Sequence, residues 1–367
     1  MIFMKIVLIN LNTKGGMVHY ISQLANALMK NNTVYVIAHK GIEKKFFDNS
    51  INIIQLDTGN TKKNFILNTI LIHKSLKFLN TIYQINPHII HLQACHLWVC
   101  FFLPFLKKYK IITTIHDITP HVGSRSIGQD ISRKIHIKYS DALIVHGQNA
   151  KEILAKESNK KKIFVVPHGD YSFFAKVCDR KYKEEPFSIL FFGRIEAYKG
   201  LTYLIQAVPL IASKISNLKV IIAGSGSFSE KDKVEKSPYF EIHNYFIEDK
   251  DVGYFFARSA IVVLPYIEGT QTGIIPIAYS FKKPVIVTNV GSIPEVVDEG
   301  ITGYVVPPKD PKALADAIIK ILSNDHLRTQ MGENAYNKMR NELSWDSIAQ
   351  KTQKIYEEAL ETKYEGN

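Results

Sequence analysis

Cysteine is scarce in this chain of 367 residues, and long apolar runs are absent. The three cysteines (Cys95, Cys100 and Cys178) form no CxxC pair, and no histidine pair has metal-ligand spacing. These absences argue against disulfides and structural zinc, and they favour a reducing, cytoplasmic location. The longest apolar run, residues 97–106, contains a proline and is too short to span a bilayer. We also expect no signal peptide, because Lys5 interrupts the apolar start of the chain.

The positive charge of the chain is confined to one half. Residues 1–180 carry 24 lysines and arginines against 10 acidic residues, whereas residues 181–367 carry 22 against 24. Such an excess points to an anionic partner of the first half, and solvated lysines on exposed faces are the alternative explanation. Nucleic acid is not expected as a partner, because the basic residues form no surface interleaved with aromatic side chains.

Short strand-like segments alternate with amphipathic helical segments along the chain. Segments such as KIVLIN (residues 5–10) are apolar on both faces, as buried parallel strands are. The alternation restarts at SILFFGR (188–194), after the charged segment DRKYKEEP (179–186), which we interpret as a linker. We therefore predict an α/β protein with two tandem Rossmann-like domains whose parallel sheets face a central cleft. The predicted domains are residues 1–178 together with a returning helix in 345–367, and residues 179–344.

Each half has a candidate phosphate site where a strand gives way to a helix. Gly15 and Gly16 precede an amphipathic helix, and bare N–H groups at a helix start can receive a phosphate. A tight structural turn is the alternative there. In the second half, Arg194 and Lys199 follow a strand, and two converging cations suit a diphosphate. Two solvated surface cations are the alternative at that place.

A histidine and an aspartate, His116 and Asp117, come just after the strand-like run KIITT (110–114). Sites of α/β proteins lie at the carboxyl ends of parallel strands. His116 is therefore a candidate to hydrogen-bond a sugar hydroxyl or a developing charge, and a satisfied structural histidine is the alternative.

Two other motifs are weak evidence for a cofactor or metal site. AGSG (223–226) begins like a dinucleotide fingerprint, but Ser229 stands where the third glycine belongs, so a nicotinamide cofactor is not predicted. EDKD (248–251) has the spacing of a metal–diphosphate motif but does not end a buried strand, and we predict a solvated turn. We predict no metal site and no cofactor.

The second half resembles a known family. GRIEAYKG (193–200) and the run from PYIEGTQTG (265–273) through KKPVIVTNVGSIPEVVDEGITGYVVPP (282–308) resemble the second domain of family 4 glycosyltransferases. These are retaining enzymes of the GT-B fold. The glycine turn of the first half, the histidine turn and the final helix are similar too, so the resemblance spans nearly the whole chain.

The resemblance implies a retaining, metal-independent glycosyltransferase that moves a sugar from a UDP- or GDP-sugar to a glycan or lipid-linked acceptor, in the synthesis of cell-surface polysaccharide or glycolipid. It places the donor diphosphate on Arg194 and Lys199, and it places Glu268 and His116 at the transferred sugar. The remaining donor contacts that it implies are the backbone amides of Thr272, Gly273, Ile274 and Ile275.

The chain departs from the family at the ribose. Relatives carry a second glutamate eight positions after the first, and here Pro276 and Ile277 occupy that stretch. Thr270 or Gln271 is a candidate to replace it, and Asp117 is a weaker candidate for sugar binding. A non-catalytic partner subunit and a sugar-nucleotide epimerase on a similar scaffold are the alternative functions.

The basic first half also carries the aromatic segment HLWVCFFLPFLKKYK (96–110). Together these features indicate docking at the inner, anionic face of a membrane. A buried helix is the alternative explanation of this segment.

Overall fold

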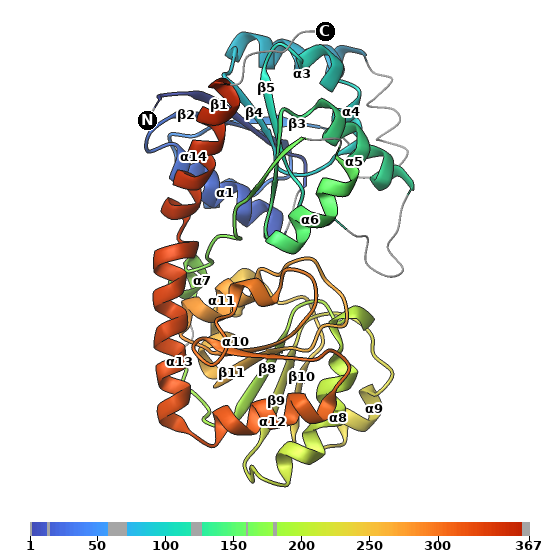
Figure 1. Ribbon diagram of the computed structural model, residues 1–367, viewed down its shortest axis with the longest axis vertical. Coiled ribbons are helices and arrows are strands. Elements are labelled where there is room, and N and C mark those ends of the chain that lie inside the picture. The colour runs from blue at the N-terminus through green and yellow to red at the C-terminus, as the bar shows by residue number, and fades with distance from the viewer. Residues whose placement is uncertain are drawn as a thin grey trace. The chain divides into compact units, whose positions relative to one another are not determined.

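The computed structural model describes residues 2–12, 15–57, 72–118, 127–158, 161–178 and 182–361. The chain divides into two compact units. Unit 1 consists of Met1–Pro167 and Trp345–Asn367, and unit 2 consists of His168–Ser344. Each unit has an open, entirely parallel sheet with helices packed on it (Figure 1). The predicted α/β fold with two Rossmann-like domains is confirmed.

Within its described residues, unit 1 has a seven-stranded sheet of order β3-β2-β1-β4-β5-β6-β7. The strands are β1 (Lys5–Asn10), β2 (Thr33–His39), β3 (Asn52–Leu56), β4 (Ile89–Leu92), β5 (Lys110–Thr114), β6 (Ala142–Val145) and β7 (Lys162–Val165). The helices are α1 (Gly16–Leu28), α3 (Ile72–Ile85), α4 (Leu97–Cys100), α5 (Ile127–Tyr139), α6 (Gln148–Glu157) and α14 (Trp345–Glu361), with short 3-10 helices η1 (Lys44–Phe46) and η2 (Leu103–Leu106).

Unit 2 has a six-stranded sheet of order β10-β9-β8-β11-β12-β13 in its described residues. The strands are β8 (Ser188–Phe192), β9 (Lys219–Ala223), β10 (Phe240–His243), β11 (Ile261–Leu264), β12 (Val285–Thr288) and β13 (Gly303–Val306). The helices are α7 (Phe173–Val177), α8 (Leu201–Ala212), α9 (Lys231–Glu235), α10 (Asp249–Arg258), α11 (Ile274–Ser280), α12 (Pro311–Leu322) and α13 (Asp325–Lys338). Shorter turns are η3 (Ala197–Lys199), η4 (Pro294–Val296) and the π-helical η5 (Met339–Leu343).

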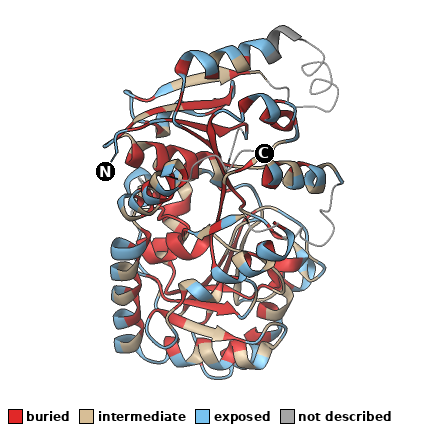
Figure 2. Ribbon diagram, turned by 45° about the horizontal axis from the view of Figure 1, so that its top comes forward, coloured by how far each residue is buried: buried red, intermediate tan, exposed pale blue. Residues whose placement is uncertain are grey.

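Both faces of each sheet are covered at its centre, which explains why the central strands are nearly continuous apolar runs, whereas the edge strands β3, β7, β10 and β13 are only partly buried. In β1, Ile6 and Leu8 pack in one core with α1 and α14, whereas Val7 and Ile9 pack in the core on the other face. Successive side chains of a strand point to opposite faces, so a strand covered on both sides needs apolar residues at every position. Figure 2 shows most of the central strands buried and the outer surfaces of the helices exposed.

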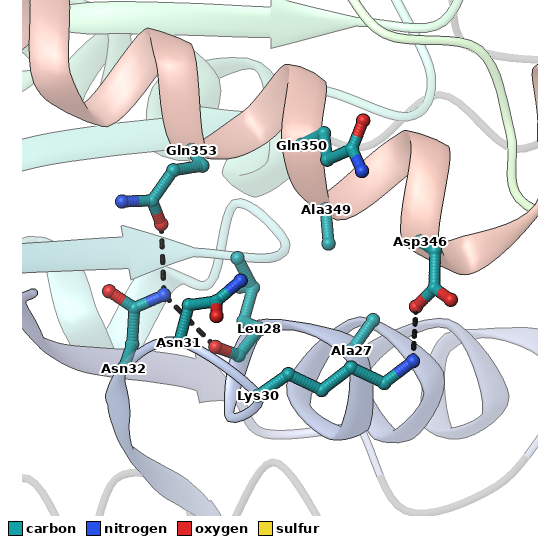
Figure 3. A pocket seen from close by; sticks show the side chains of 9 residues that line it. All are labelled: Ala27, Leu28, Lys30, Asn31, Asn32, Asp346, Ala349, Gln350 and Gln353. Carbon is teal, nitrogen blue, oxygen red and sulfur yellow. Dashed lines mark hydrogen bonds and ion pairs between the residues drawn. The ribbon is translucent and has the colours of Figure 1, made fainter. Parts of the chain in front are cut away.

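The helix α14 packs along α1 within unit 1. Lys30 pairs with Asp346 at 2.5 Å, and Asn32 Nδ2 donates to Gln353 Oε1 at 2.9 Å. In Figure 3 these two pairs lie at opposite ends of a cavity of about 180 Å³ between the helices. Because four of the polar side chains that line the cavity are paired across the two helices, we assign it to helix packing and not to a ligand.

The boundary between the domains differs from the prediction. Residues 168–178, which we assigned to the first domain, belong to unit 2, because α7 packs on α10. A Cβ atom on Gly253 of α10 would lie 2.7 Å from Cys178 Cβ, which shows how close this packing is. Residues 179–181 and 362–367 lie outside the described residues.

Two charged segments are more ordered than predicted. The end of the predicted linker is bonded into unit 2, because Glu184 pairs with Lys283 and Glu185 pairs with Arg258. The EDKD segment is solvated as predicted, with the Glu248 and Lys250 side chains 64% and 63% exposed, but Asp249–Asp251 form the first turn of α10 and not a loop. Acidic side chains are favoured at a helix N-terminus, where the helix dipole is positive.

The apolar segment 97–106 folds into two short elements, α4 and η2. None of the helices in the described ranges combines the length and the apolarity that crossing a bilayer requires.

Arg258, the last residue of α10, connects strand β10 to the segment before β8. Its Nη1 and Nη2 atoms donate to the two carboxylate oxygens of Glu241 at 2.6 and 2.5 Å, and its Nε atom donates to Glu185. The Arg258 side chain is only 11% exposed. These hydrogen bonds from Arg258 lower the pKa of Glu241 to about 2.

We expect Glu241→Gln to reduce the free energy of unfolding by about 2 kcal/mol at pH 7, because it leaves a buried guanidinium with one carboxylate fewer. The folded-state pKa of Glu241 lies below its ordinary value of 4.5. The contribution of this carboxylate is therefore complete above about pH 4.5 and is lost as the pH falls toward 2.

Denaturant unfolding of both proteins at pH 7 and pH 3 measures this difference, which should shrink at pH 3. The matched control is Glu333→Gln, which breaks an exposed pair with Lys282 (2.7 Å) and should cost less than about 1 kcal/mol. Equal losses from the two substitutions would contradict the assignment.

Candidate functional site

Two loops of unit 2 leave the same edge of its sheet. Strands β8 and β11 are parallel neighbours, so the turn after β8 and the loop after β11 both start at their carboxyl ends. The loops touch each other, because Ile267 N donates to Tyr198 O at 2.8 Å. The predicted donor residues of the second half lie on these two loops.

Lys199, at the end of η3, is the most constrained charge in this region. Only 7% of the residue is exposed, and its Nζ atom lies 5.4 Å from the centroid of the Tyr266 ring. In the part of the chain that the structure describes, it forms no ion pair with a carboxylate. Burial and the neighbouring charge of Arg194 lower the pKa of Lys199 to about 8.

Gly193, the residue after β8, makes room for this ammonium group. Its φ angle is +101°, and a Cβ atom there would lie 2.7 Å from Lys199 Nζ. A side chain at position 193 would therefore strain the backbone and displace the cation. Gly193, directly after β8, and Lys199, at the end of η3, thus form one local arrangement.

Arg194 does not share this environment. Its side chain is 69% exposed and pairs with Glu196 at 2.9 Å. The two predicted cations are therefore not equivalent: one is buried without a carboxylate partner, and the other is exposed with a weak one. An exposed ion pair of this kind contributes little, so a more highly charged anion can replace Glu196 as the partner of Arg194.

The loop after β11 is held firmly through its backbone. Ser292 N donates to Thr270 O at 3.0 Å, and a Cβ atom on Gly291 would lie 1.9 Å from Gly269 O. Some polar side-chain atoms of this loop, in contrast, lack hydrogen bonds to the described residues. The buried atoms Thr270 Oγ1 and Gln271 Oε1 have no hydrogen-bond partner within the described ranges. Buried polar atoms normally have one, so these two are candidate ligand contacts.

The loop runs into α11 through a close backbone contact. A Cβ atom on Gly273 would lie 3.1 Å from the ring of Tyr171, and Thr272 Oγ1 accepts a hydrogen bond from Ile274 N at 3.2 Å. Amide groups at a helix start have no acceptor inside the helix. Ile274 and Ile275 form the buried first turn that follows.

Two further positions of this loop bear on the predicted roles. Glu268 is partly exposed and has no ion pair among the described residues. Pro276 and Ile277, which stand where relatives have a second glutamate, are buried in α11. Neither of them can bind a ribose hydroxyl.

The candidate residues of unit 1 lie after β1 and β5. Gly15 has a φ angle of +78° and precedes Gly16, the first residue of α1. Among the residues that the structure describes, none has a heavy atom within 4 Å of a Cβ atom placed on Gly15. His116 is partly buried and Asp117 is exposed.

The structure adds a histidine that the sequence analysis missed. His146 Nε2 lies 2.9 Å from His116 Nδ1, and His146 Nδ1 lies 2.9 Å from the carbonyl oxygen of Val166. Burial lowers the pKa of His146 to about 4. The sequence places each histidine just after a strand-like run. Their contact, however, depends on the register that pairs Thr114 of β5 with Ile144 of β6, which is non-local.

The predicted site residues thus fall into two groups, one in each unit. The described residues contain no group of three or more histidines, cysteines or acidic residues that could hold a metal ion.

Comparisons with known proteins agree with this arrangement. Residues 14–169 match the family described as Glycosyltransferase Family 4, and residues 178–338 match the family described as Glycosyl transferases group 1. The uncharacterized glycosyltransferase MJ1607 of Methanocaldococcus jannaschii is 27% identical over 297 residues, which are 73% of this chain and 75% of that protein. The capsular polysaccharide biosynthesis glycosyltransferase CapM of Staphylococcus aureus is 30% identical over 182 residues, which are 48% of this chain and 47% of that protein.

Solved structures show the same fold at lower sequence identity. Sucrose-phosphate synthase from Thermosynechococcus elongatus has a TM-score of 0.76 at 19% identity and covers 96% of this chain and 98% of its own. Anabaena HepE in complex with UDP-glucose has a TM-score of 0.72 at 16% identity, with 97% and 100% coverage. The family matches cover both units, and the chain therefore belongs to the family 4 glycosyltransferases and is a glycosyltransferase of the GT-B fold.

Proposed function

We propose that this enzyme transfers a sugar, with retention of configuration and without a metal ion, from a nucleoside diphosphate to a glycan or lipid-linked acceptor. The observation that carries the proposal is Lys199, a buried ammonium with no carboxylate partner among the described residues. A buried charge is costly unless it is paired. The diphosphate of the donor supplies the missing negative charge.

The expected donor is a UDP- or GDP-sugar. The structural neighbour HepE is in complex with UDP-glucose, and the relative CapM is named for capsular polysaccharide biosynthesis. These names support a nucleotide-sugar donor and an acceptor that belongs to a cell-surface polysaccharide or glycolipid.

The chemistry follows from where charge develops. When the glycosidic bond breaks, the diphosphate leaving group becomes more negative. We assign Lys199, Arg194 and the amides of residues 272–275 as donors to that charge, with the Ile274 amide exchanging its hydrogen bond to Thr272 Oγ1 for a phosphate oxygen. Groups fixed before the reaction stabilise such a charge with little reorganisation. The two cations do the work that a metal ion does in other transferases. In unit 1, the turn at Gly15 and Gly16 gives the phosphates a second set of backbone donors.

We assign the remaining residues to the sugar and the ribose. Glu268 accepts hydrogen bonds from hydroxyls of the transferred sugar. Thr270 and Gln271 hydrogen-bond the ribose hydroxyls in place of the missing second glutamate. Their buried side-chain oxygens have no hydrogen-bond partner among the described residues. His116 binds a sugar hydroxyl, and Asp117 is adjacent to it in the same turn.

The direction of attack follows from the residue types. Retention by two displacements requires a carboxylate nucleophile on the far face of the sugar, and Glu268 is assigned to hydroxyls. We therefore propose front-side attack, in which the C1–O bond to the diphosphate breaks as the acceptor oxygen bonds to C1. The leaving phosphate oxygen takes the proton of the acceptor hydroxyl.

A thermal-shift screen of UDP-, GDP- and dTDP-sugars, followed by product analysis, tests this function. The true donor should raise the Tm, because a ligand that binds only the folded state stabilises it. Transfer should require an acceptor and should persist in a metal chelator. A changed sugar in the absence of an acceptor would instead identify an epimerase, and binding without any turnover would identify a non-catalytic subunit.

We expect Lys199→Met to lower kcat/KM by about 10²–10³-fold, because it removes one fixed donor from the leaving group. The same substitution should leave the Tm of the protein without donor unchanged or higher, since methionine fills the space without a buried charge. Lys214→Met, at an exposed position on the same unit, is the control and should change kcat/KM less than threefold. A change below threefold in Lys199→Met would show that Lys199 does not contact the diphosphate.

Donor affinity should depend on pH through the same residue. The pKa of Lys199 is about 8, so the ammonium form is complete below that pH and is lost above it. The affinity for the nucleoside diphosphate should fall by up to about tenfold per pH unit above pH 8, because binding then requires a proton. Calorimetric titration between about pH 7.5 and 9.5 measures this slope, and it should be flat for Lys199→Met. A slope that is equal in both proteins would assign the titration to another group.

We also propose that unit 1 docks on an anionic membrane surface through an apolar-basic face. Its apolar members are Leu97 on α4, Phe101 directly after α4 and Phe105 on η2, together with Ile127 and Ile131 on the neighbouring α5. They are 36–80% exposed. Its basic members are the exposed Lys107, Lys108, Lys134 and Lys138. The inner residues of the same segment, such as Trp98 and Leu103, are buried, so the segment is a core element with an apolar outer surface.

Vesicle flotation tests this face. The protein should float with vesicles that contain phosphatidylglycerol at low ionic strength, and not with phosphatidylcholine alone. Phe101→Ser together with Phe105→Ser should weaken binding at least about tenfold, because each ring buries apolar area in the interface. The matched control changes Tyr245 and Phe246, two exposed aromatics of unit 2, to serine and should have no effect. Absence of flotation at low ionic strength would rule out the membrane partner.

A further inference from the structure

The strand register of unit 1 brings two histidines together at the edge of the sheet. Strands β5 and β6 are parallel, with Thr114 opposite Ile144, and Ile115 N donates to Ile144 O at 2.8 Å. Two residues after each register partner, the chain carries His116 and His146. Their side chains meet at 2.9 Å between His116 Nδ1 and His146 Nε2.

A third group defines the direction of this hydrogen bond. His146 Nδ1 lies 2.9 Å from Val166 O, and a carbonyl oxygen can only accept. The Nδ1 atom of His146 therefore carries a proton. In a neutral imidazole the other nitrogen is then an acceptor, so His146 Nε2 accepts the proton of His116 Nδ1.

The environment keeps His146 neutral and both rings in place. His146 is 6% exposed, and burial lowers its pKa to about 4, so it is uncharged at neutral pH. The ring of Tyr20 contacts both imidazoles edge-on, with centroid distances of 4.9 Å to His116 and 5.5 Å to His146. The rings therefore have little freedom to rotate out of this arrangement.

We propose that His146 is a positioning residue that holds His116 in the Nδ1–H form, so that the Nε2 lone pair of His116 accepts a hydrogen bond from a hydroxyl of the bound sugar. This inference rests on the proposed role of His116 in the transfer. Partners that fix the tautomer of a functional histidine typically change activity by 10–100-fold when they are removed, as established for histidines that bind metals.

The direct test is the tautomer of His116 in the full chain. In protein labelled with ¹⁵N-histidine, long-range ¹H–¹⁵N spectra distinguish a protonated Nδ1 from a protonated Nε2, and His116→Gln assigns the signal. We expect Nδ1–H in the unaltered protein. We expect a change to Nε2–H in His146→Phe, which keeps the ring volume and removes the acceptor.

The matched control is His136→Phe. His136 is also buried, its Nδ1 atom also lies within hydrogen-bond distance of a carbonyl (2.8 Å to Ser132 O), and burial also lowers its pKa to about 4. It has no contact with His116 among the described interactions of the two rings. This variant should leave the His116 signal unchanged even if it costs the same stability.

Kinetics provide the second readout. His146→Phe should lower kcat about 10–100-fold and leave KM for the donor within threefold, because the diphosphate contacts are intact. His146→Gln, whose side-chain oxygen can accept from His116, should recover most of the loss. An Nε2–H form of His116 in the unaltered protein, an unchanged tautomer in His146→Phe, or full turnover by that variant would overturn the inference about His146. Full turnover by His116→Gln would instead overturn the proposed role of His116 itself.

Discussion

The stability and chemistry of unit 2 depend on Lys199, a buried ammonium group with no carboxylate partner in the described part of the chain. An acidic neighbour could neutralise Lys199, yet Glu196 pairs with Arg194 instead. On the loop after β11, the ammonium group of Lys199 faces the aromatic ring of Tyr266. The fold thus retains an electrostatic cost that a bound anion removes. Functional sites commonly lower the stability of the protein when they are empty, and this is a trade-off between stability and activity. The bound ligand then stabilises the protein.

The parallel sheets explain how the polar residues of each unit come together. Parallel strands with both faces buried leave only their carboxyl ends for polar side chains, so residues far apart in the sequence meet at one edge. In unit 2 this edge joins Gly193 and Lys199 to the loop that carries Glu268 and Thr270. In unit 1 the same rule, applied through strand register, joins His116 to His146.

Much of the fold and part of the site could be predicted from the sequence. The strands, the glycine at position 193 and the lysine after it follow local rules, because apolar runs and strand-end glycines have few alternatives. The exposure of Arg194 could not be predicted, since it depends on its pairing with Glu196. The role of His146 needed the register of β5 and β6, and the domain boundary depended on the packing of α7 against α10, which are both non-local.

The most direct test of the account is a thermodynamic cycle between Lys199 and the second phosphate of the ligand. Calorimetry would compare the nucleoside diphosphate with the monophosphate of the same base, in the unaltered protein and in Lys199→Met. The account predicts a coupling energy of about 1.5–3 kcal/mol, because a charge-assisted bond is lost only when both groups are present. Equal weakening of both ligands by the substitution would contradict it.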